Sequence, residues 1–556
     1  MIPVHSVHFL ANGGIHMSYR MKWVTVTLLL TSLGLLLAAC GQKATTTKQK
    51  VFKTTINANP DTLDPAQYTL NVSAEVINAE QQGLYTRDAK NKVVAGVAKS
   101  YTTNVDKTVY TFTLKHTKWS NGKPVTAADF VYAFKRLADP KVGASQAARV
   151  DFLKNGQAVR SGNKPLSSLG AKALGTYKLQ LTLSEPLTYL KDLLTGTPYV
   201  PVNEAFVNKV GKKFGTSSAD VLANGPFTVK GFSLKNDNWT YQKNNKFWDK
   251  QSVKLDSVSV RVVKDSGTAA NLFNTGKVDY AALTSENLSR FTNNKALHQI
   301  TTPTIGYLSM NFNRSATANV HLRRAIAESF DKSKFAKNVL KDGSTALNGL
   351  VPSNLSANPK TGKDYRKDTG NLITFNPTDA KAEWAKAQQE LGKSSLTLTL
   401  LTADTEDAKN AGEFLQGQIE SHLPGVHITL KSIPVAQRIA LERSGNYDIA
   451  FGTWAPDFDD PINFLDVYQS TGQLNFSKYN SKAYDADLAE IHGSLANQPE
   501  ARYQAIQQAE TRMIKTDVAI APVYQVGLSY VQNPKTSGLS IIPFGSTVNY
   551  QYIEVK

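Results

Sequence analysis

Hydrophobic and polar positions alternate in short stretches over residues 51–302. Val109–Lys115 and Lys178–Leu183 have the period of two that is typical of half-buried strands. A helix is predicted for Ala127–Leu137, where apolar residues recur at helical spacing after Thr126, a residue type that caps helix starts well. We therefore expect this part of the chain to be rich in β-strands.

From Gly306 onward the pattern changes to one of strands and helices in alternation. Two helices are predicted first, at Val320–Leu340 and Thr378–Leu391. Strands are then predicted at Leu396–Thr402, Val426–Ile433 and Tyr447–Trp454, separated by helices at Glu406–Leu423 and Ala436–Arg443. Such alternation predicts right-handed crossovers and a parallel sheet, and ligands bind these sheets outside the carboxyl ends of the strands.

The segment that follows the last predicted strand, Thr453–Pro461 (TWAPDFDDP), concentrates carboxylates, aromatic rings and prolines. Asp457 comes directly after the apolar strand, so we expect it to be more enclosed than Asp459 or Asp460. An enclosed carboxylate needs a cation or several hydrogen-bond donors, and the ammonium group of a ligand is one solution. The alternative is an acidic turn in which Asp459 or Asp460 caps a helix at 462–467, and a calcium loop fits the spacing less well.

The amino-terminal residues predict export. Residues 20–40 contain basic residues, an apolar run of about a dozen (VTVTLLLTSLGLL) and Leu37-Ala38-Ala39-Cys40. The run is shorter than the ~20 residues that span a bilayer. Leu-Ala-Ala-Cys resembles the lipobox of bacterial lipoproteins, in which the chain is cut before the cysteine and the sulfur carries a diacylglycerol. We therefore predict a signal peptide at 1–39, with 1–16 an over-extended start, and a lipidated Cys40 followed by a flexible tether to residue 50.

Composition and charge narrow the class of protein. The chain has 556 residues, of which 41% are apolar and 19% charged, as in globular proteins. The formal net charge of +18 favours anionic neighbours, but an exported protein does not meet nucleic acid, so we expect attraction to an anionic cell envelope. One cysteine excludes an intramolecular disulfide and a cysteine metal cluster.

The sequence gives little support for an enzyme. Ser329–Lys332, Ser356–Asn358 and Lys360–Gly362 match the three signatures of penicillin-interacting enzymes, but they fall within 34 residues, whereas those signatures come from distant parts of a fold. Zinc-protease, nucleophile-elbow and phosphate-loop motifs do not occur, and the histidines are scattered. We expect no enzyme, no metal site and no cofactor.

A family resemblance is carried by Tyr110–Pro140 (YTFTLKHTKWSNGKPVTAADFVYAFKRLADP), which is similar to the signature region of family 5 extracytoplasmic solute-binding proteins, the peptide-binding subunits of ABC importers. Further matching segments follow in the family's order over nearly the whole mature chain: Asp61–Pro65, Thr182–Pro186, Ala223–Thr228, Asn313–Lys332 and Trp454–Leu465. Within the family, the sequence of residues 118–140 is most similar to that of oligopeptide-binding lipoproteins.

The resemblance implies an α/β, two-lobed fold of the periplasmic-binding-protein type, class II with an extra subdomain, whose lobes close over the ligand. Lobe I would comprise 51–75, 215–305 and 525–556, the inserted subdomain 76–214, and lobe II 306–524. Hinge strands would lie near Thr304–Tyr307 and Pro522–Gln525.

The resemblance also implies the site. In oligopeptide binders of this type an extended peptide pairs through its main chain, and an aspartate in a motif that follows a Trp binds the peptide's α-ammonium group. Here these are Asp457 and Trp454. The main-chain contacts would fall on Thr453, Trp454 and Ala455 and, on the opposite lobe, on Ala66, Gln67, Tyr68 and Thr69. Because Pro456 has no N–H, pairing would end at Ala455 or use carbonyl groups only.

The expected function is capture of oligopeptides outside the cell and delivery to a permease with ATPase subunits. We expect a monomer held by its lipid anchor on the extracellular face of the cell membrane, in a Gram-positive-type envelope. Alternatives are a receptor for a dipeptide, nickel chelate, haem or sugar, or a peptide-pheromone sensor or adhesin that passes nothing on.

Overall fold

The computed structural model describes residues 49–472, 474–542, 544 and 547–556. The predicted signal peptide and Cys40 lie outside these residues. Apart from Gln49, the described residues belong to one compact unit, Lys50–Lys556. In the part of the chain that is described, no helix has both the length and the apolar character needed to cross a bilayer.

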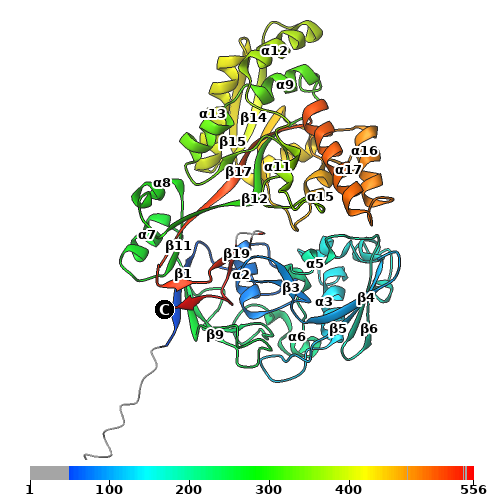
Figure 1. The fold of residues 1–556 in the computed structure, drawn as a ribbon, viewed down its shortest axis with the longest axis vertical. Coiled ribbons are helices and arrows are strands. Elements are labelled where there is room, and N and C mark those ends of the chain that lie inside the picture. Colours follow the sequence, from blue (N-terminus) through cyan, green and yellow to red (C-terminus); the bar gives the residue numbers. More distant parts are fainter. Residues whose placement is uncertain (1–48, 473, 543, 545–546) are drawn as a thin grey trace, which may run out of the picture. The chain divides into compact units, whose positions relative to one another are not determined.

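Two long antiparallel strands, β12 (Leu297–Met310) and β17 (Ile520–Gln532), lie side by side in the middle of an eleven-stranded mixed sheet (Figure 1). Beyond β12 come β16 (Ile449–Trp454), β14 (Leu396–Ala403) and β15 (Val426–Ile433). Beyond β17 come β11 (Tyr280–Leu283), β1 (Val51–Ile56), β10 (Ser257–Val262), β9 (Asn238–Lys243) and β8 (Phe227–Lys230), and β13 (Thr345–Ala346) pairs with β17. The register of β12 on β17 shifts between Thr301 and Ile305 and again after Gly306, within the region predicted for the hinge.

The predicted parallel sheet is confirmed. Strand β14 pairs in parallel with both β15 and β16, and α13 (Glu406–His422) and α14 (Val435–Ser444) form the crossovers. Helix α12 (Pro377–Leu391) ends at Gly392, which adopts a left-handed φ of 63° that suits a residue without a Cβ.

The predicted helix Val320–Leu340 is wrong as a single element. The chain forms α9 (Val320–Glu328), then α10 (Lys332–Lys334) and a π-helical turn at Phe335–Leu340. The break occurs because the Asp331 carboxylate accepts the backbone N–H groups two and three residues further on, each at 3.0 Å, and so starts a new helix.

A four-stranded antiparallel sheet lies in the predicted subdomain. It has the order β4 (Ala98–Thr103), β5 (Val109–Leu114), β7 (Lys178–Thr182) and β6 (Ala171–Gly175). The predicted helix is α3 (Ala127–Ala138), where Thr126 and Asp129 form a capping box, with the Thr126 N–H donating to Asp129 over 2.7 Å. Both strand predictions and the helix prediction for this region are confirmed.

The remaining elements are short or peripheral. The helices are α2 (Asn71–Glu80), α4 (Gly156–Arg160), α5 (Leu190–Leu193), α6 (Glu204–Val210), α7 (Ser266–Asn274), α8 (Ser285–Leu288), α11 (Tyr365–Thr369), α15 (Ile462–Leu465), α16 (Lys482–His492) and α17 (Pro499–Thr511). The strands are β2 (Tyr85–Arg87), β3 (Val93–Ala95), β18 (Thr536–Ser537), β19 (Ser540–Ile542), β20 (Thr547–Asn549) and β21 (Glu554–Val555).

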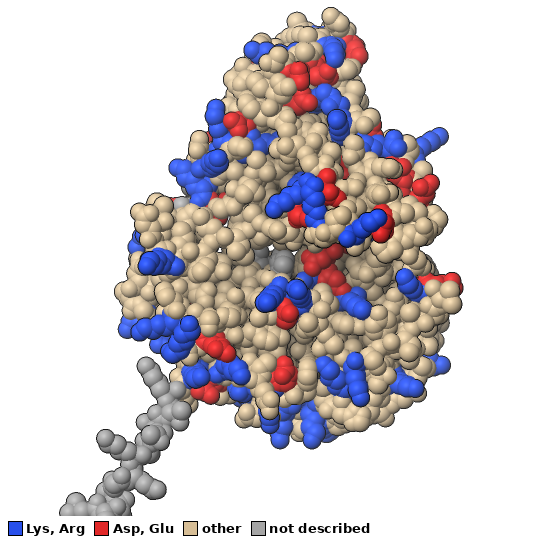
Figure 2. Space-filling view, viewed as in Figure 1, with Lys and Arg blue, Asp and Glu red and all other residues tan. Residues whose placement is uncertain are grey.

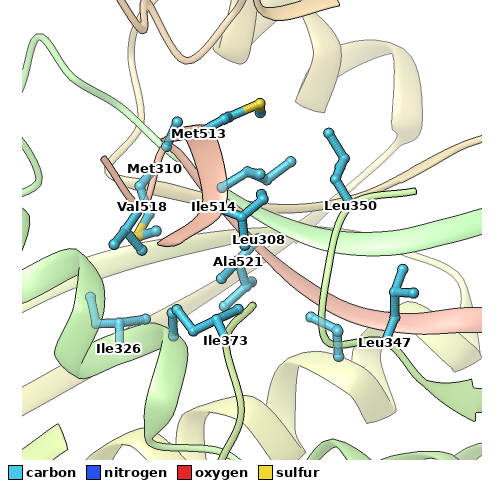
Figure 3. Close-up of a cluster of buried hydrophobic side chains, with 14 of the residues drawn as sticks. Leu308, Met310, Ile326, Leu347, Leu350, Ile373, Met513, Ile514, Val518 and Ala521 are labelled. Atoms are coloured by element: carbon cyan, nitrogen blue, oxygen red, sulfur yellow. The ribbon is translucent and has the colours of Figure 1, made fainter. Parts of the chain in front are cut away.

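Buried apolar side chains form three large clusters. The largest comes from residues 305–524 and includes Leu308, Ile326 and Ile514 (Figure 3). A second is built from residues 66–222, and a third lies around β1, β8–β10 and the C-terminal strands. Helix α2 runs across the predicted boundary between residues 75 and 76 and packs into the third cluster, so the exact domain limits stay a prediction.

Candidate ligand-binding site

A cavity of about 290 Å³ lies where distant segments of the chain meet. Its lining comes from Tyr68 and Thr69, from α2 and the residues after it, from residues 193 and 195–200, from Ala455–Asp457 and from the C-terminal residues 542, 544 and 547–551. Most of the polar lining is neutral, with Asn and Gln side chains prominent. Of the described residues, the charged ones in the lining are Arg87, Arg149 and Asp457. Figure 2 shows a hollow near the middle of the visible face with acidic and basic side chains beside it.

Asp457 forms an ion pair with Arg149, which lies in a short 3-10 helix (Ala147–Val150) of the predicted subdomain. The Nη2 of Arg149 donates to Oδ1 of Asp457 over 2.7 Å, and Nη1 contacts Oδ2. The two side chains are each 37% exposed. The carboxylate at the end of β16 therefore has a cation of the protein itself as its partner.

The expectation that Asp457 is the most enclosed of the three aspartates is wrong. Asp460 is only 7% exposed, and its carboxylate binds Arg502 over 2.8 and 3.1 Å. Asp460 also accepts the N–H of Ile462, the first residue of α15, over 3.0 Å, which agrees with the alternative of an acidic turn before this helix, although the N-cap position itself is Pro461. The reason is the direction of the chain, which passes the cavity at Asp457 and then turns back toward α17 of its own lobe.

Asp459 and Phe458 contact the predicted subdomain. Asp459 pairs with Arg87 over 2.9 Å, and its backbone N–H donates to the carboxylate of Asp192, which also binds Arg87. Burial, together with the negative charge of Asp459, raises the pKa of Asp192 to about 6. The Phe458 ring stacks on Tyr189 with centroids 3.9 Å apart. Consecutive residues after β16 thus contact residues 87, 189 and 192, all within the predicted subdomain.

Two other predicted positions near β16 do not line the cavity. Thr453 pairs with Gly306 of β12 inside the sheet. Trp454 donates its Nε1–H to Asn463 over 3.3 Å and packs against the large core cluster. Ala455 is the residue of this stretch that joins Asp457 in the lining.

On the opposite side, Tyr68 and Thr69 line the cavity, whereas Ala66 is buried and Gln67 donates its side chain to the carbonyl of Val142 over 3.0 Å. Burial raises the pKa of Tyr68 to about 12. The backbone N–H groups of all four residues bind acceptors within the chain, at Asp61 or Asp64. Ligand pairing through these N–H groups would require them to exchange partners.

Several lining residues were not predicted from the sequence. They are Arg149 and Gln146, the amides Asn78, Gln81 and Gln82 in or after α2, and the C-terminal Asn549 and Gln551. Each lies in a short segment without a motif, and the segments meet only through the fold. Asn78 was the one signal available, since it is a polar position on a helix whose other residues are mostly buried.

The serine and lysine of the S-x-x-K match are both buried. Ser329 donates to the carbonyl of Ile326 over 2.8 Å, and Lys332 donates to the carbonyl of Ile373 over 3.0 Å. Neither side chain lines the cavity. Within the described residues, no group of three or more His, Cys, Asp or Glu side chains is placed to hold a metal ion.

Comparison with known families gives a match over most of the chain. Residues 92–476 match the model described as "Bacterial extracellular solute-binding proteins, family 5 Middle". The chain belongs to this family. Its members are binding proteins rather than enzymes, and the fold is their two-lobed α/β fold.

Individual relatives cover nearly the whole chain. A dipeptide-binding protein of Lactococcus lactis subsp. cremoris is 30% identical over 551 residues, which is 96% of this chain and 99% of the relative. The solved structure of Listeria monocytogenes OppA bound to peptide is 34% identical, with a TM-score of 0.75, over 91% of this chain and 99% of that one. The substrate-binding domain of an oligopeptide ABC transporter from Bacillus anthracis is 35% identical, with a TM-score of 0.76, over the same shares.

Proposed function

We propose that this protein is a substrate-binding lipoprotein that captures oligopeptides outside the cell and delivers them to the permease and ATPase subunits of an ABC importer. The observation that carries the proposal is the cavity, whose lining among the described residues combines neutral amides and hydroxyl groups with one carboxylate, that of Asp457. The main chain of a peptide presents N–H and C=O groups along its length, and amide side chains can form hydrogen bonds with either kind of group whatever the peptide's side chains are.

Asp457 is proposed to bind the α-ammonium group of the peptide. Support comes from its place after β16, in the lining of the cavity, and from the Trp454 motif of the family resemblance. Ala455 and Tyr68 supply surfaces on the two sides of the same cavity, and Ala455 precedes the proline that interrupts main-chain pairing. Thr453, Trp454, Ala66 and Gln67 do not line the cavity, so their main-chain contact with a ligand stays a prediction.

The lipid anchor is part of the proposal. Cys40 would carry the lipid, and residues 41–50 would link it to the folded unit, which begins at Lys50. The tether would reach ~30 Å when fully extended. The protein would then work as a monomer just outside the cell membrane, where the permease accepts its ligand.

Mass spectrometry of small molecules released by unfolding the purified chain 41–556 tests the substrate class. Short peptides of mixed sequence are expected, because backbone pairing tolerates varied side chains. Recovery of a metal chelate, haem or saccharide instead would overturn peptide capture and leave Asp457 as a turn residue with an ion pair.

Dipeptide capture is the second candidate. The cavity of about 290 Å³ lies at the lower end of the ~300–1,000 Å³ typical of ligand pockets. The Lactococcus relative is named a dipeptide-binding protein. The length distribution of the released peptides distinguishes the two candidates, since dipeptides alone would favour the second.

A further inference from the structure

Asp457, the proposed ammonium site, is paired with a cation of the protein's own. Arg149 binds it with two nitrogens, Nη2 to Oδ1 over 2.7 Å and Nη1 to Oδ2, in the fork arrangement that guanidinium and carboxylate groups favour. A ligand ammonium group that reached Asp457 would seek the same two oxygens. The guanidinium therefore occupies the place where the ligand's charge is expected.

The surroundings leave Arg149 able to give up this contact. Its side chain is 37% exposed and lines the cavity, so it would remain accessible to water after leaving Asp457. Its other side-chain hydrogen bond joins Nε to the Oε1 of Gln146 over 3.3 Å, one turn away on the same segment. An exposed ion pair of this kind is weak enough for a ligand to displace.

We infer that Arg149 is a built-in competitor for the α-ammonium group of the ligand and so helps to set the protein's affinity and specificity for free-amine peptides. The inference rests on the proposed function above. A peptide with a free amino terminus replaces the guanidinium at Asp457, whereas an amino-terminally blocked peptide offers no replacement charge. The same pair joins lobe II to the subdomain without ligand, because its two residues come from those two parts.

The competitor model predicts a gain of affinity when the guanidinium is removed. Arg149→Gln keeps a long polar side chain but no charge, and we expect free-amine peptides to bind about two- to fivefold more tightly, the upper part of the range that exposed ion pairs span. The probe is a synthetic library of random tri- to pentapeptides, prepared with free and with acetylated amino termini. The retained peptides are measured at pH 6.5 by mass spectrometry, and the affinities of the most retained pairs by calorimetry.

The chain offers a matched control in Arg160. This arginine also forms a fork with an aspartate, Asp151, over 2.7 Å at both contacts, and its side chain is 26% exposed. It lies in the same predicted subdomain but does not line the cavity. Arg160→Gln should leave the binding of both libraries unchanged, which separates loss of any arginine–aspartate pair from loss of the competitor.

Ligand-free protein gives an independent readout. Because the chain 49–556 contains no cysteine, Lys172→Cys and Lys381→Cys at exposed positions allow two fluorescent labels, one in the subdomain and one in lobe II. Without ligand, Arg149→Gln should leave energy transfer between the labels unchanged, as Arg160→Gln should, because the contacts of Asp459 with Arg87 and of Phe458 with Tyr189 still join the two parts. A fall in energy transfer with Arg149→Gln alone would mean that the pair holds the two parts together, and would overturn its role as a competitor only.

The outcomes separate this inference from the proposed function. Tighter binding of free-amine peptides by Arg149→Gln, with acetylated peptides unaffected, supports the competitor. Weaker or unchanged free-amine binding by Arg149→Gln, alongside a loss in Asp457→Asn, overturns the competitor and keeps Asp457 as the ammonium site. If Asp457→Asn does not alter the preference for free over acetylated peptides, the ammonium site fails and the competitor fails with it.

Discussion

Asp457 and Asp460 are three residues apart, yet they serve different parts of the molecule. Asp457 lines the cavity with its side chain 37% exposed, whereas Asp460 is almost buried and holds Arg502 and the start of α15. Charge alone would not distinguish them in the sequence, because both follow the same strand. The two residues differ in role because the fold gives each carboxylate a different neighbour.

Replacing Asp457 by Asn should weaken the binding of free-amine peptides by about tenfold or more, because the neutral amide offers no charge attraction to the ammonium group of the ligand. Calorimetry with one peptide in free and acetylated form measures the effect, and the acetylated form should be little changed. Asp151→Asn is the matched control, since Asp151 pairs with Arg160 away from the cavity. Equal losses for both peptides would contradict a role in recognising the amine.

Replacing Glu510 by Gln should destabilise the fold without changing peptide affinity. Its fully buried carboxylate accepts the backbone N–H groups of Leu350 and Val351, the hydroxyl of Tyr365 and both Nη groups of Arg366. The neutral amide leaves the Arg366 charge buried and unbalanced, so the free energy of unfolding should fall by about 3 kcal/mol.

Denaturant unfolding of Glu510→Gln measures this change, and Glu500→Gln is its control. Glu500 is 62% exposed and 3.8 Å from Lys360, so its loss should alter the free energy of unfolding by less than about 0.5 kcal/mol. A change below 1 kcal/mol in Glu510→Gln would show that the buried network is not required for stability.

At the scale of elements, sequence periodicity was enough to place most helices and strands of residues 396–454 and the parallel pairing among them. It missed the break in Val320–Leu340, because a single carboxylate, Asp331, restarts the helix by a local hydrogen bond that periodicity does not register. Strand order was not predictable from pattern either. Neighbours such as β1 and β10 are about 200 residues apart in the chain, and nothing local records their pairing.

The same limit applies to the site. Asp457, Ala455, Tyr68 and Thr69 were placed by resemblance and meet in one cavity. Arg149 could not be predicted, because an arginine in a short 3-10 helix has no periodic or motif signal until a distant aspartate is brought to it.

The pairing of β12 with β17 depends on a glycine. Gly306 lies opposite Tyr524, and a Cβ at this position would come within 1.9 Å of the Tyr524 ring. Gly306→Ala should therefore force the ring away from Phe335 and lower the free energy of unfolding by about 1–3 kcal/mol. Thermal unfolding measures this loss, and adding Tyr524→Leu should recover part of it.

The control for Gly306→Ala is the same substitution at Gly417. Gly417 lies within α13 with open space where the Cβ would be, so alanine should stabilise the helix by about 0.5–1 kcal/mol. If both alanine variants were equally stable, the close approach of Tyr524 would not limit the strand pairing.

At the scale of the whole molecule, a histidine connects segments that are far apart in the chain. His492 of α16 binds Asp466 over 2.8 Å and lies 3.4 Å from Glu185 of the subdomain. Its burial lowers its pKa, but the hydrogen bonds and charges of the two carboxylates outweigh this and raise the pKa to about 10. A raised histidine pKa stabilises the fold fully below its ordinary value near 6.5, and the contribution is lost as the pH rises through about 10.

His492→Gln should therefore cost stability in acid and little in base. We expect the variant to unfold about 1–3 kcal/mol more easily than the parent at pH 6, where the charged hydrogen bonds are intact, and the difference to shrink steadily toward pH 10. Denaturant unfolding at several pH values, without peptide, avoids titration of the ligand's own amino group. His427→Gln, at an exposed position of β15, should show no such trend. A stability gap that stays constant from pH 6 to 10 would mean that His492 acts by packing rather than by its charge.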